Sequence, residues 1–429
     1  MNRREFSQSL LLSGTAALAG HAGAQERTSP NVSADYYEEP VKKLPVRRYD
    51  VVIAGGGTAG VVAGLAAARR GVKTALIEAK GYPGGTVVEG GTALHSFYNL
   101  WKAFPGVAKR QLVKGIPQEI VNRLAKAGGT SGHAEMLKGY DYDSVCTAID
   151  TEKYKLVVFE MLEEAGVQCF MSTLLAGGLR EGSRLTGVIA ESRSGREAIL
   201  AKSFVDCTAY GDLSAFAGAK FSEPNDYPVC NSIGMANVNV EKYHEFIKSH
   251  DALTEYAEGW RSGREGQIVR LNGRLVGLPQ EFAEEARKIG MSMTTTTVHD
   301  DYFMFIKVNY KMPVSPTSRD AATRAELELR KRQARTVELF RKHVPGCSKA
   351  FITRTSPSLN IRRGRLISCD YDLSLPDVLE GRHHGLRIPR LRTSPANQER
   401  RQLWNTLSGA AGRRNRQSPG CRHDDHLQP

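Results

Sequence analysis

Residues 49–85 read YDVVIAGGGTAGVVAGLAAARRGVKTALIEAKGYPGG, and this stretch decides the fold. The short apolar run Val51–Ala54 is typical of a buried parallel strand, and the small residues of 59–70 favour a helix that packs closely on a sheet. Gly71 then ends the helix, and a second apolar run ends at Glu78. The order strand, glycine turn, helix and strand predicts a unit that binds a dinucleotide.

Three glycines in this unit fill the pattern Gly-x-Gly-x-x-Gly. Gly55 permits a tight turn, Gly57 lets a diphosphate approach the backbone, and Gly60 lets the helix pack closely on the strand. Thr58 and Ala59 lie at the start of the helix, where backbone N–H groups face a bound phosphate. We therefore expect all five residues to contact the dinucleotide. The alternative is a glycine turn with a structural role only.

An acidic residue and a second glycine turn complete the unit. Glu78 lies about 20 residues beyond the glycines, where a carboxylate can accept hydrogen bonds from ribose hydroxyls, and Ala79 follows it. Gly84, Gly85 and Thr86 then offer a second turn with exposed backbone. Because the same unit binds NAD and FAD, the motif alone does not decide between the two cofactors.

Beyond this turn the chain resembles the FAD-dependent oxidoreductases of the glutathione reductase type, and more narrowly the bacterial family grouped near the A-type subunit of heterodisulfide reductase. The resemblance continues through residues 149–221, which include Asp206-Cys207-Thr208-Ala209-Tyr210-Gly211-Asp212 near their end. This stretch matches the Asp-x-Thr-x-x-Gly-Asp element of the family. The resemblance implies FAD as cofactor.

The same resemblance implies further contacts to FAD. Thr208, Gly211 and Asp212 are expected to bind the cofactor, with Asp212 near its ribityl or phosphate region. Leu175 is expected to pass the adenine with its backbone. A local alternative for Asp212 is that it caps the short helix that follows it.

The fold that this resemblance implies is α/β, with a Rossmann-like FAD-binding domain of the glutathione reductase type and an inserted α+β substrate domain. The expected segments are a twin-arginine signal peptide (1–24), a linker (25–48), FAD-binding segment 1 (49–95), a helical segment near the flavin (96–148), FAD-binding segment 2 (149–221), a substrate or cap domain (222–345), a segment that returns to the cleft (346–383) and a divergent basic tail (384–429), expected to be disordered.

The first residues resemble an export signal. Arg3-Arg4 followed by Phe6 is similar to the twin-arginine motif, and a weakly apolar run leads to Ala22-Gly23-Ala24, a site suited to a signal peptidase. No run of about 18 apolar residues follows, so we expect no stable membrane anchor. The hypothesis is export of folded protein to the periplasm by the twin-arginine machinery. An ordinary secretory leader or a chance basic start are the alternatives.

Charge and cysteine spacing argue against two classes of protein. The net charge is +13, but roughly half of this excess lies in the last fifty residues, where aromatic residues for base stacking are nearly absent. We therefore expect no nucleic-acid partner. The seven cysteines form no CxxC pair and no Cys/His cluster at ligand spacing, so we expect no metal and no iron–sulfur cluster.

Two residues are candidates for catalysis. His95 lies in GGTALHSFYNLWKAF, a segment that the resemblance places along the flavin, and an imidazole can exchange protons near neutral pH. Arg362 and Arg365 match arginines of the family in SPSLNIRRGRLISCDYDLSLPDVL, residues 356–379. Arg362 could hold an anionic substrate through its planar guanidinium. The alternatives are a hydrogen-bonded loop histidine and a structural ion pair. Asn360 and Arg363 depart from the glycine and glutamate of the family.

The predicted function is hydride transfer between a small organic substrate and flavin N5, with electrons passed to an unidentified acceptor. After about residue 381 neither periodicity nor the resemblance can be followed, whereas relatives continue with a third flavin segment. The alternatives are therefore a defective or non-catalytic FAD-binding remnant, and a binding protein that keeps the fold without redox turnover.

Overall fold

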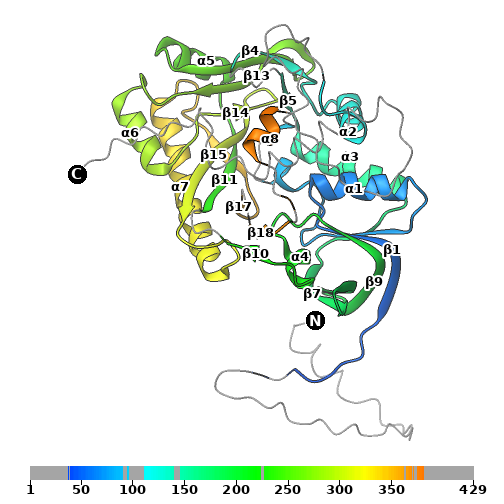
Figure 1. Ribbon diagram of the computed structural model, residues 1–429. Coiled ribbons are helices and arrows are strands. Elements are labelled where there is room, and N and C mark those ends of the chain that lie inside the picture. The colour runs from blue at the N-terminus through cyan, green and yellow to red at the C-terminus, as the bar shows by residue number, and fades with distance from the viewer. Residues whose placement is uncertain are drawn as a thin grey trace, which may run out of the picture. The chain divides into compact units, whose positions relative to one another are not determined.

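The computed structural model describes residues 37, 39–89, 94–95, 111–139, 145–223, 227–361, 364–369, 371 and 374–380. Contacts between residues divide the chain into two units, Met1–Leu44 and Pro45–Pro429. Every helix and strand of the described ranges lies in the second unit (Figure 1).

The first sheet of this unit contains the dinucleotide unit. Its six strands run in the order β6-β2-β1-β9-β8-β7; β6, β2, β1 and β9 are parallel, and β9, β8 and β7 form an antiparallel meander. These strands are β1 (Val46–Ala54), β2 (Thr74–Ile77), β6 (Gln168–Phe170), β7 (Leu174–Glu181), β8 (Arg184–Ser192) and β9 (Gly195–Asp206). Ala54 lies opposite Asp206, so β1 and β9 end at the same edge.

Helices bury one face of this sheet and the meander helps to bury the other. Ile53 packs with α1 (Thr58–Ala68) and α3 (Thr151–Glu164), and α2 (Ile116–Lys126) joins the same cluster. Val52 and Ala54 pack on the opposite face, with residues of β8, β9 and α4 (Asp212–Phe216). Successive residues of β1 are thus buried on alternate faces, and the predicted buried parallel strand is confirmed.

Two further sheets occupy the rest of the unit. One has the order β15-β11-β16, with β17 also on β11, and the other has the order β14-β13-β12-β4-β5-β3. Their strands are β3 (Leu94–His95), β4 (Ala134–Lys138), β5 (Val145–Ala148), β11 (Tyr227–Ala236), β12 (Leu253–Arg261), β13 (Arg264–Gly273), β14 (Thr295–Thr296), β15 (Tyr302–Met312), β16 (Phe351–Thr355) and β17 (Asn360–Ile361).

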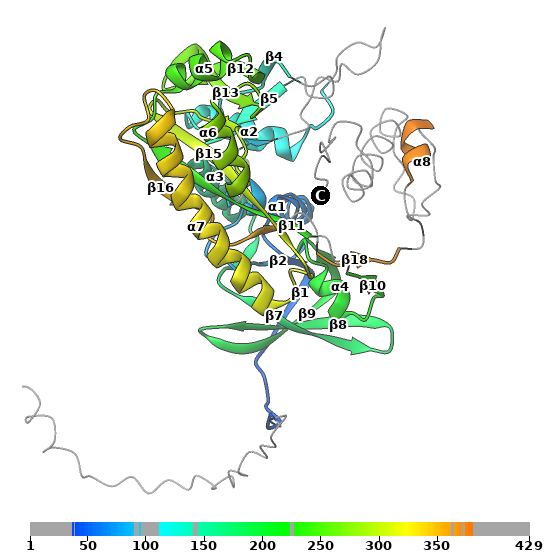
Figure 2. The same ribbon diagram turned by 90° about the vertical axis from the view of Figure 1, so that its left-hand side faces the viewer.

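The remaining elements are α5 (Val240–Ser249), α6 (Gln280–Ile289), α7 (Arg319–His343), α8 (Leu375–Glu380), the 3-10 helix η1 (Gly85–Val87) and the two-stranded pair β10 (Phe221–Ser222) and β18 (Leu366–Ile367). The long helix α7 runs beside the β15-β11-β16 sheet (Figure 2). Helices with the length and apolar character for a bilayer span are absent from the described ranges.

The segment 96–148 differs from its prediction as a helical segment. It contains α2, but also β4 and β5, and β4 pairs with β12 through Ala257 opposite Met136. The four or five residues of each strand are too few for a periodic pattern to stand out in the sequence. β4 also pairs with a strand more than a hundred residues further along the chain, and β5 pairs with β4 and β3.

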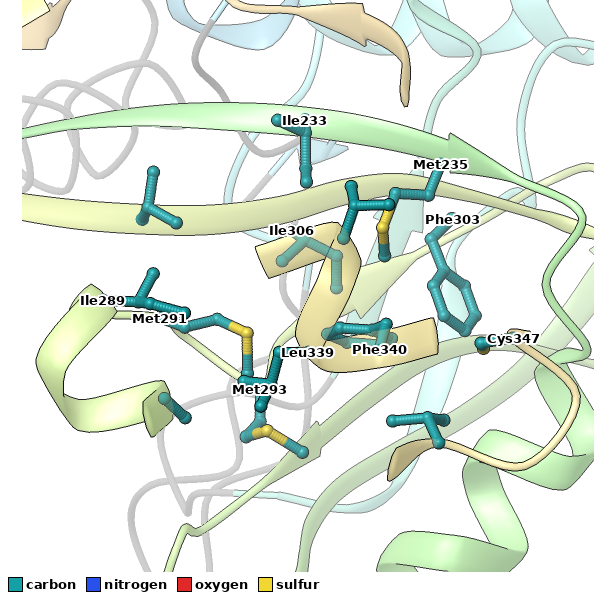
Figure 3. Close-up of a cluster of buried hydrophobic side chains, with 14 of the residues drawn as sticks. Ile233, Met235, Ile289, Met291, Met293, Phe303, Ile306, Leu339, Phe340 and Cys347 are labelled. Carbon is teal, nitrogen blue, oxygen red and sulfur yellow. The ribbon is translucent and has the colours of Figure 1, made fainter. Parts of the chain in front are cut away.

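The largest core cluster fills the space between the β15-β11-β16 sheet and α7 (Figure 3). Ile233 and Met235 of β11, Phe303 and Ile306 of β15, and Phe340 of α7 are all fully buried. The aromatic rings interlock, since the Phe303 and Phe340 centroids lie 6.1 Å apart at an interplanar angle of 70°. This core holds the β15-β11-β16 sheet against α7.

Truncation of this core should destabilise the protein. We expect Phe340→Ala to lower the free energy of unfolding by about 3–5 kcal/mol, because a fully buried ring leaves a cavity. Urea unfolding followed by circular dichroism measures it. Leu327→Ala on the same helix is the control: Leu327 is 60% exposed, and its loss should change stability by no more than about 0.5 kcal/mol. Equal effects of both changes would contradict this packing.

Candidate functional site

The first glycine turn joins β1 to α1 at the carboxyl end of the parallel strands. Gly55 has a φ of +96°, and its N–H donates to the Ile77 carbonyl at 2.8 Å. A Cβ on Gly55 would lie 2.7 Å from the Cys207 carbonyl carbon, and one on Gly60 would lie 3.0 Å from the Gly55 carbonyl carbon. Neither position has room for a side chain, so backbone alone forms the surface of the turn.

The second glycine turn packs directly against the first. The Gly84 N–H donates to the Gly56 carbonyl at 2.9 Å, and the Thr58 hydroxyl donates to the Gly84 carbonyl at 3.3 Å. A Cβ on Gly85 would lie only 2.8 Å from Gly57 Cα. Two segments some thirty residues apart in sequence therefore meet through bare backbone.

Helix α1 begins at this meeting point without a protein cap. Gly57 is its N-cap residue, no side chain of the described residues caps it, and its first turn holds no acidic residue. Ala59 and Thr86 are exposed beside it, and Thr58 is half-buried. The first N–H groups of α1 thus keep their capacity to bind an anion, which the positive end of the helix favours.

The Glu78 carboxylate turns back over the first glycine turn. Its Oε2 accepts from the Gly56 N–H at 2.6 Å, and its Oε1 accepts from the Lys80 N–H at 2.9 Å. An ionised carboxylate has about four acceptor positions, so about two remain for hydroxyl groups. Glu78 therefore orders the turn and still has acceptor capacity toward a ribose.

The chain that leads into β7 runs alongside Glu78. The Thr173 N–H donates to the Glu78 carbonyl at 3.0 Å, and the Ser172 N–H donates to the Lys80 carbonyl at 2.8 Å. Leu175 follows in β7 and is half-buried, whereas Ala79 is exposed. The structure thus brings the segment predicted for the adenine next to the acidic residue predicted for the ribose.

The Asp206–Asp212 stretch lies beside the first glycine turn. The Cys207 N–H donates to the Ala54 carbonyl at 2.7 Å, and a Cβ on Gly55 would lie 2.9 Å from Thr208 N. The Asp206 carboxylate holds the stretch together: Oδ1 accepts from the Thr208 hydroxyl at 2.8 Å and Oδ2 from the Ser214 hydroxyl at 2.7 Å. The family motif indicates Asp212 as a cofactor residue, but it gives no separate role to Asp206.

Asp212 starts α4 and pairs with an arginine from the return segment. Its N–H donates to the Thr208 hydroxyl at 3.0 Å, and its carboxylate accepts from Arg365 Nη1 at 2.5 Å. Gly211 has a φ of +68°, and a Cβ there would lie 2.8 Å from Ile367 Cδ1. Arg365 therefore contacts Asp212, a residue predicted to bind the cofactor. The spacing of the two residues in the sequence does not predict this contact.

The two candidates for catalysis stay predictions. The backbone of His95 lies in β3 opposite Thr147, but its side chain is outside the described residues, and so is Arg362. The contacts that would assign them a role are therefore not part of the described structure.

This geometry fits a dinucleotide site, and a comparison with protein families decides the class of protein. A family model described as "FAD dependent oxidoreductase" matches residues 50–390. The chain belongs to this FAD-dependent oxidoreductase family. The match includes both glycine turns, the Asp206–Asp212 stretch and the return segment.

Several solved structures resemble this chain in part. A geranylgeranyl bacteriochlorophyll reductase-like protein from Thermoplasma acidophilum has 15% identity and a TM-score of 0.41, over 74% of this chain and 67% of that one. An anhydrotetracycline hydroxylase from Streptomyces rimosus has 10% identity and a TM-score of 0.43, over 75% and 54%. A myxobacterial chondrochloren halogenase has 15% identity and a TM-score of 0.43, over 74% and 64%. The chain thus spans less than two thirds of the hydroxylase and the halogenase.

FAD is the cofactor of this family, and the residues present fit it. Side chains are excluded at Gly55, where a Cβ would lie 2.7 Å from the Cys207 carbonyl carbon, and at Gly85, where it would lie 2.8 Å from Gly57 Cα, so both turns offer bare backbone to a diphosphate. Glu78 offers carboxylate oxygens at the end of β2, and Thr208 lies beside the first turn. The mixed α/β architecture and the FAD cofactor are thus confirmed.

Glu78 provides a test of the cofactor site. We expect Glu78→Ala to weaken FAD binding by roughly ten- to a hundred-fold, since a hydrogen bond to a charged group contributes about 1.5–3 kcal/mol. Titration of the apoprotein with FAD, followed by flavin fluorescence, measures it.

Two variants make this test specific. Glu78→Gln keeps an acceptor oxygen for the Gly56 N–H and should weaken binding less than the alanine variant. Glu163→Ala removes an exposed carboxylate from α3 and should leave affinity unchanged. Wild-type affinity in Glu78→Ala would remove Glu78 from the site.

Proposed function

We propose that the protein transfers a hydride between a small organic substrate and flavin N5, and that the electrons pass to a separate acceptor. The observation that supports this most is the backbone contact between the two glycine turns, with Glu78 and Thr208 beside it. FAD, when bound, supplies the redox chemistry, so the protein itself has to bind, orient and shield the reacting groups.

Each part of the site has a task in this proposal. The bare amides of the glycine turns and the start of α1 bind the diphosphate, and Glu78 binds the ribose of the adenosine. Asp212, held by Arg365 and by the Thr208 hydroxyl, is positioned toward the ribityl or phosphate region. His95 would move a proton during turnover, and Arg362 would hold an anionic substrate.

We also propose a narrower family for the chain and its division into a cofactor domain and a substrate domain. The Asp-x-Thr-x-x-Gly-Asp element of 206–212 supports a place near the A-type subunit of heterodisulfide reductase and a cofactor domain of the glutathione reductase type. The two antiparallel sheets that residues 227–361 form together with β3, β4 and β5 support a substrate domain inserted beside it. This division assigns binding of the flavin and binding of the substrate to different sheets.

Flavin reduction tests the proposed function. Purified protein should be yellow, lose its flavin absorbance when dithionite is added without oxygen, and recover it when an acceptor dye follows. The flavin spectrum before and after each addition is the readout. Folded protein that stays colourless after incubation with FAD would favour the defective remnant over the enzyme.

We also propose that the protein is exported to the periplasm by the twin-arginine machinery. The pair Arg3-Arg4 followed by Phe6, the weakly apolar run and Ala22-Gly23-Ala24 support this route. A chain that folds around FAD would need a route that carries folded cargo, which is a second argument for it.

The leader can be tested by conservative substitution. Arg3→Lys combined with Arg4→Lys should keep the protein in the cytoplasm, because the signal is read by a receptor and not by its charge alone. Cell fractionation and immunoblotting locate the protein. Arg27→Lys, outside the proposed signal, should leave export intact, and export of the double variant would remove the twin-arginine interpretation.

A further inference from the structure

Residues 80–89 form a loop that carries the second glycine turn, and an ion pair closes this loop at its base. Lys80 follows β2, Glu89 follows η1, and the Lys80 ammonium contacts the Glu89 carboxylate. Gly84 and Gly85 lie between the two residues in the chain. Because a contact between the ends of a loop reduces the conformations that the loop can adopt, this pair restricts the glycine turn.

The carboxylate of this pair is largely withdrawn from water. Glu89 is 7% exposed, whereas the Lys80 side chain is 33% exposed. Burial raises the pKa of Glu89, and the Lys80 ammonium acts against this rise. A buried carboxylate without a counter-charge is costly, so Glu89 can keep this place as an anion only while a cation stays beside it.

Glu89 is connected directly to the second glycine turn. Its N–H donates to the Gly85 carbonyl at 2.9 Å, and the Val88 N–H donates to the same carbonyl at 3.0 Å. Val87 and Val88 are buried in the cluster that contains residues of α1 and α3. Gly85 in turn lies against Gly57. A displacement of Glu89 is therefore transmitted to the contact between the two turns.

Lys80 is connected to the other half of the site. Its N–H donates to Glu78 Oε1 at 2.9 Å, and its carbonyl accepts from the Ser172 N–H at 2.8 Å. The backbone of Lys80 thus belongs to the part predicted for the adenosine, while its side chain reaches the base of the turn predicted for the diphosphate. The Lys80–Glu89 pair spans both parts of the cofactor site.

An ion pair between α6 and α7 provides the contrast. Lys342 of α7 pairs with Glu281 of α6, and these side chains are 63% and 66% exposed. Pairs at such exposed positions contribute little, because water screens the charges and both side chains lose entropy. The Lys80–Glu89 pair instead has a buried carboxylate, so removal of the cation leaves a charge that only movement of the chain returns to water.

We propose that Lys80 and Glu89 are positioning residues for FAD, and that their ion pair holds the second glycine turn against the first. Without Lys80, the charged Glu89 turns toward water and draws Gly85 away from Gly57. The bare backbone that binds the diphosphate is then no longer continuous. This inference goes beyond the proposed function, since it concerns retention of the cofactor and not the hydride transfer.

Titration of the apoprotein with FAD, followed by flavin fluorescence, tests this role. Lys80→Met, which keeps much of the side-chain length, should weaken FAD binding at least about ten-fold, because the Glu89 charge stays behind without a partner. Glu89→Gln should weaken it by about three- to ten-fold, since a neutral amide of the same shape can remain buried but loses the charge.

The double variant separates positioning from a sum of independent contacts. Lys80→Met combined with Glu89→Gln should bind FAD more tightly than Lys80→Met alone, because the second substitution removes the unpaired charge. Lys80→Arg keeps the cation and should lie between the wild type and Lys80→Met. Losses that simply multiply in the double variant would overturn the proposal, as would wild-type affinity in folded Lys80→Met.

Two variants outside the loop are controls. Lys342→Met breaks the exposed pair between α6 and α7 and should leave FAD affinity unchanged. Phe340→Ala weakens the core between the β15-β11-β16 sheet and α7, and its folded fraction should keep wild-type affinity. Should Lys80→Met not fold, Glu89→Gln decides, and wild-type affinity in this variant would overturn the proposal.

The proposed function fails separately from this inference. FAD affinity is measured without a substrate or an acceptor, whereas the redox function is tested by reduction and reoxidation of the flavin. Weak FAD binding in Lys80→Met, together with a wild-type flavin that cannot be reduced and reoxidised, would contradict the oxidoreductase function and leave the role of the ion pair standing.

Discussion

The contact between Gly57 and Gly85 is the constraint on which the cofactor site depends. A Cβ on Gly85 would lie 2.8 Å from Gly57 Cα, so the two turns can meet only while residue 85 lacks a side chain. Their meeting places the uncapped start of α1 next to a second stretch of open backbone. Anything that separates the turns would remove the surface that a diphosphate needs, even if every helix and strand remained.

Contacts within the chain itself hold the polar groups of the site in place. Glu78 is fixed by the N–H groups of Gly56 and Lys80, and Asp206 holds Thr208 and Ser214 in place. A binding group that is already oriented loses less conformational entropy when the ligand binds. The carboxylates thus act on the chain itself, and Asp206 has a role within the motif that requires no contact with a ligand.

Local patterns predicted much of this fold, and contacts between distant segments account for what they missed. The first βαβ unit could be predicted because its signals lie within one stretch of chain. The pairing of β4 with β12 and the contact of Arg365 with Asp212 depend on where remote segments meet. Gly234 belongs to no motif, and its close approach to Tyr302 and Arg354 appears only in the folded chain.

The second six-stranded sheet combines strands from two separate stretches of the chain. Strands β3, β4 and β5 come from the chain before β6, while β12, β13 and β14 come after β9, so the sheet closes only when both stretches are present. Cutting the gene between the two dinucleotide segments, or after them, would leave an unpaired strand edge, which invites aggregation. A recombination point at either place would therefore separate strands that pair in this sheet.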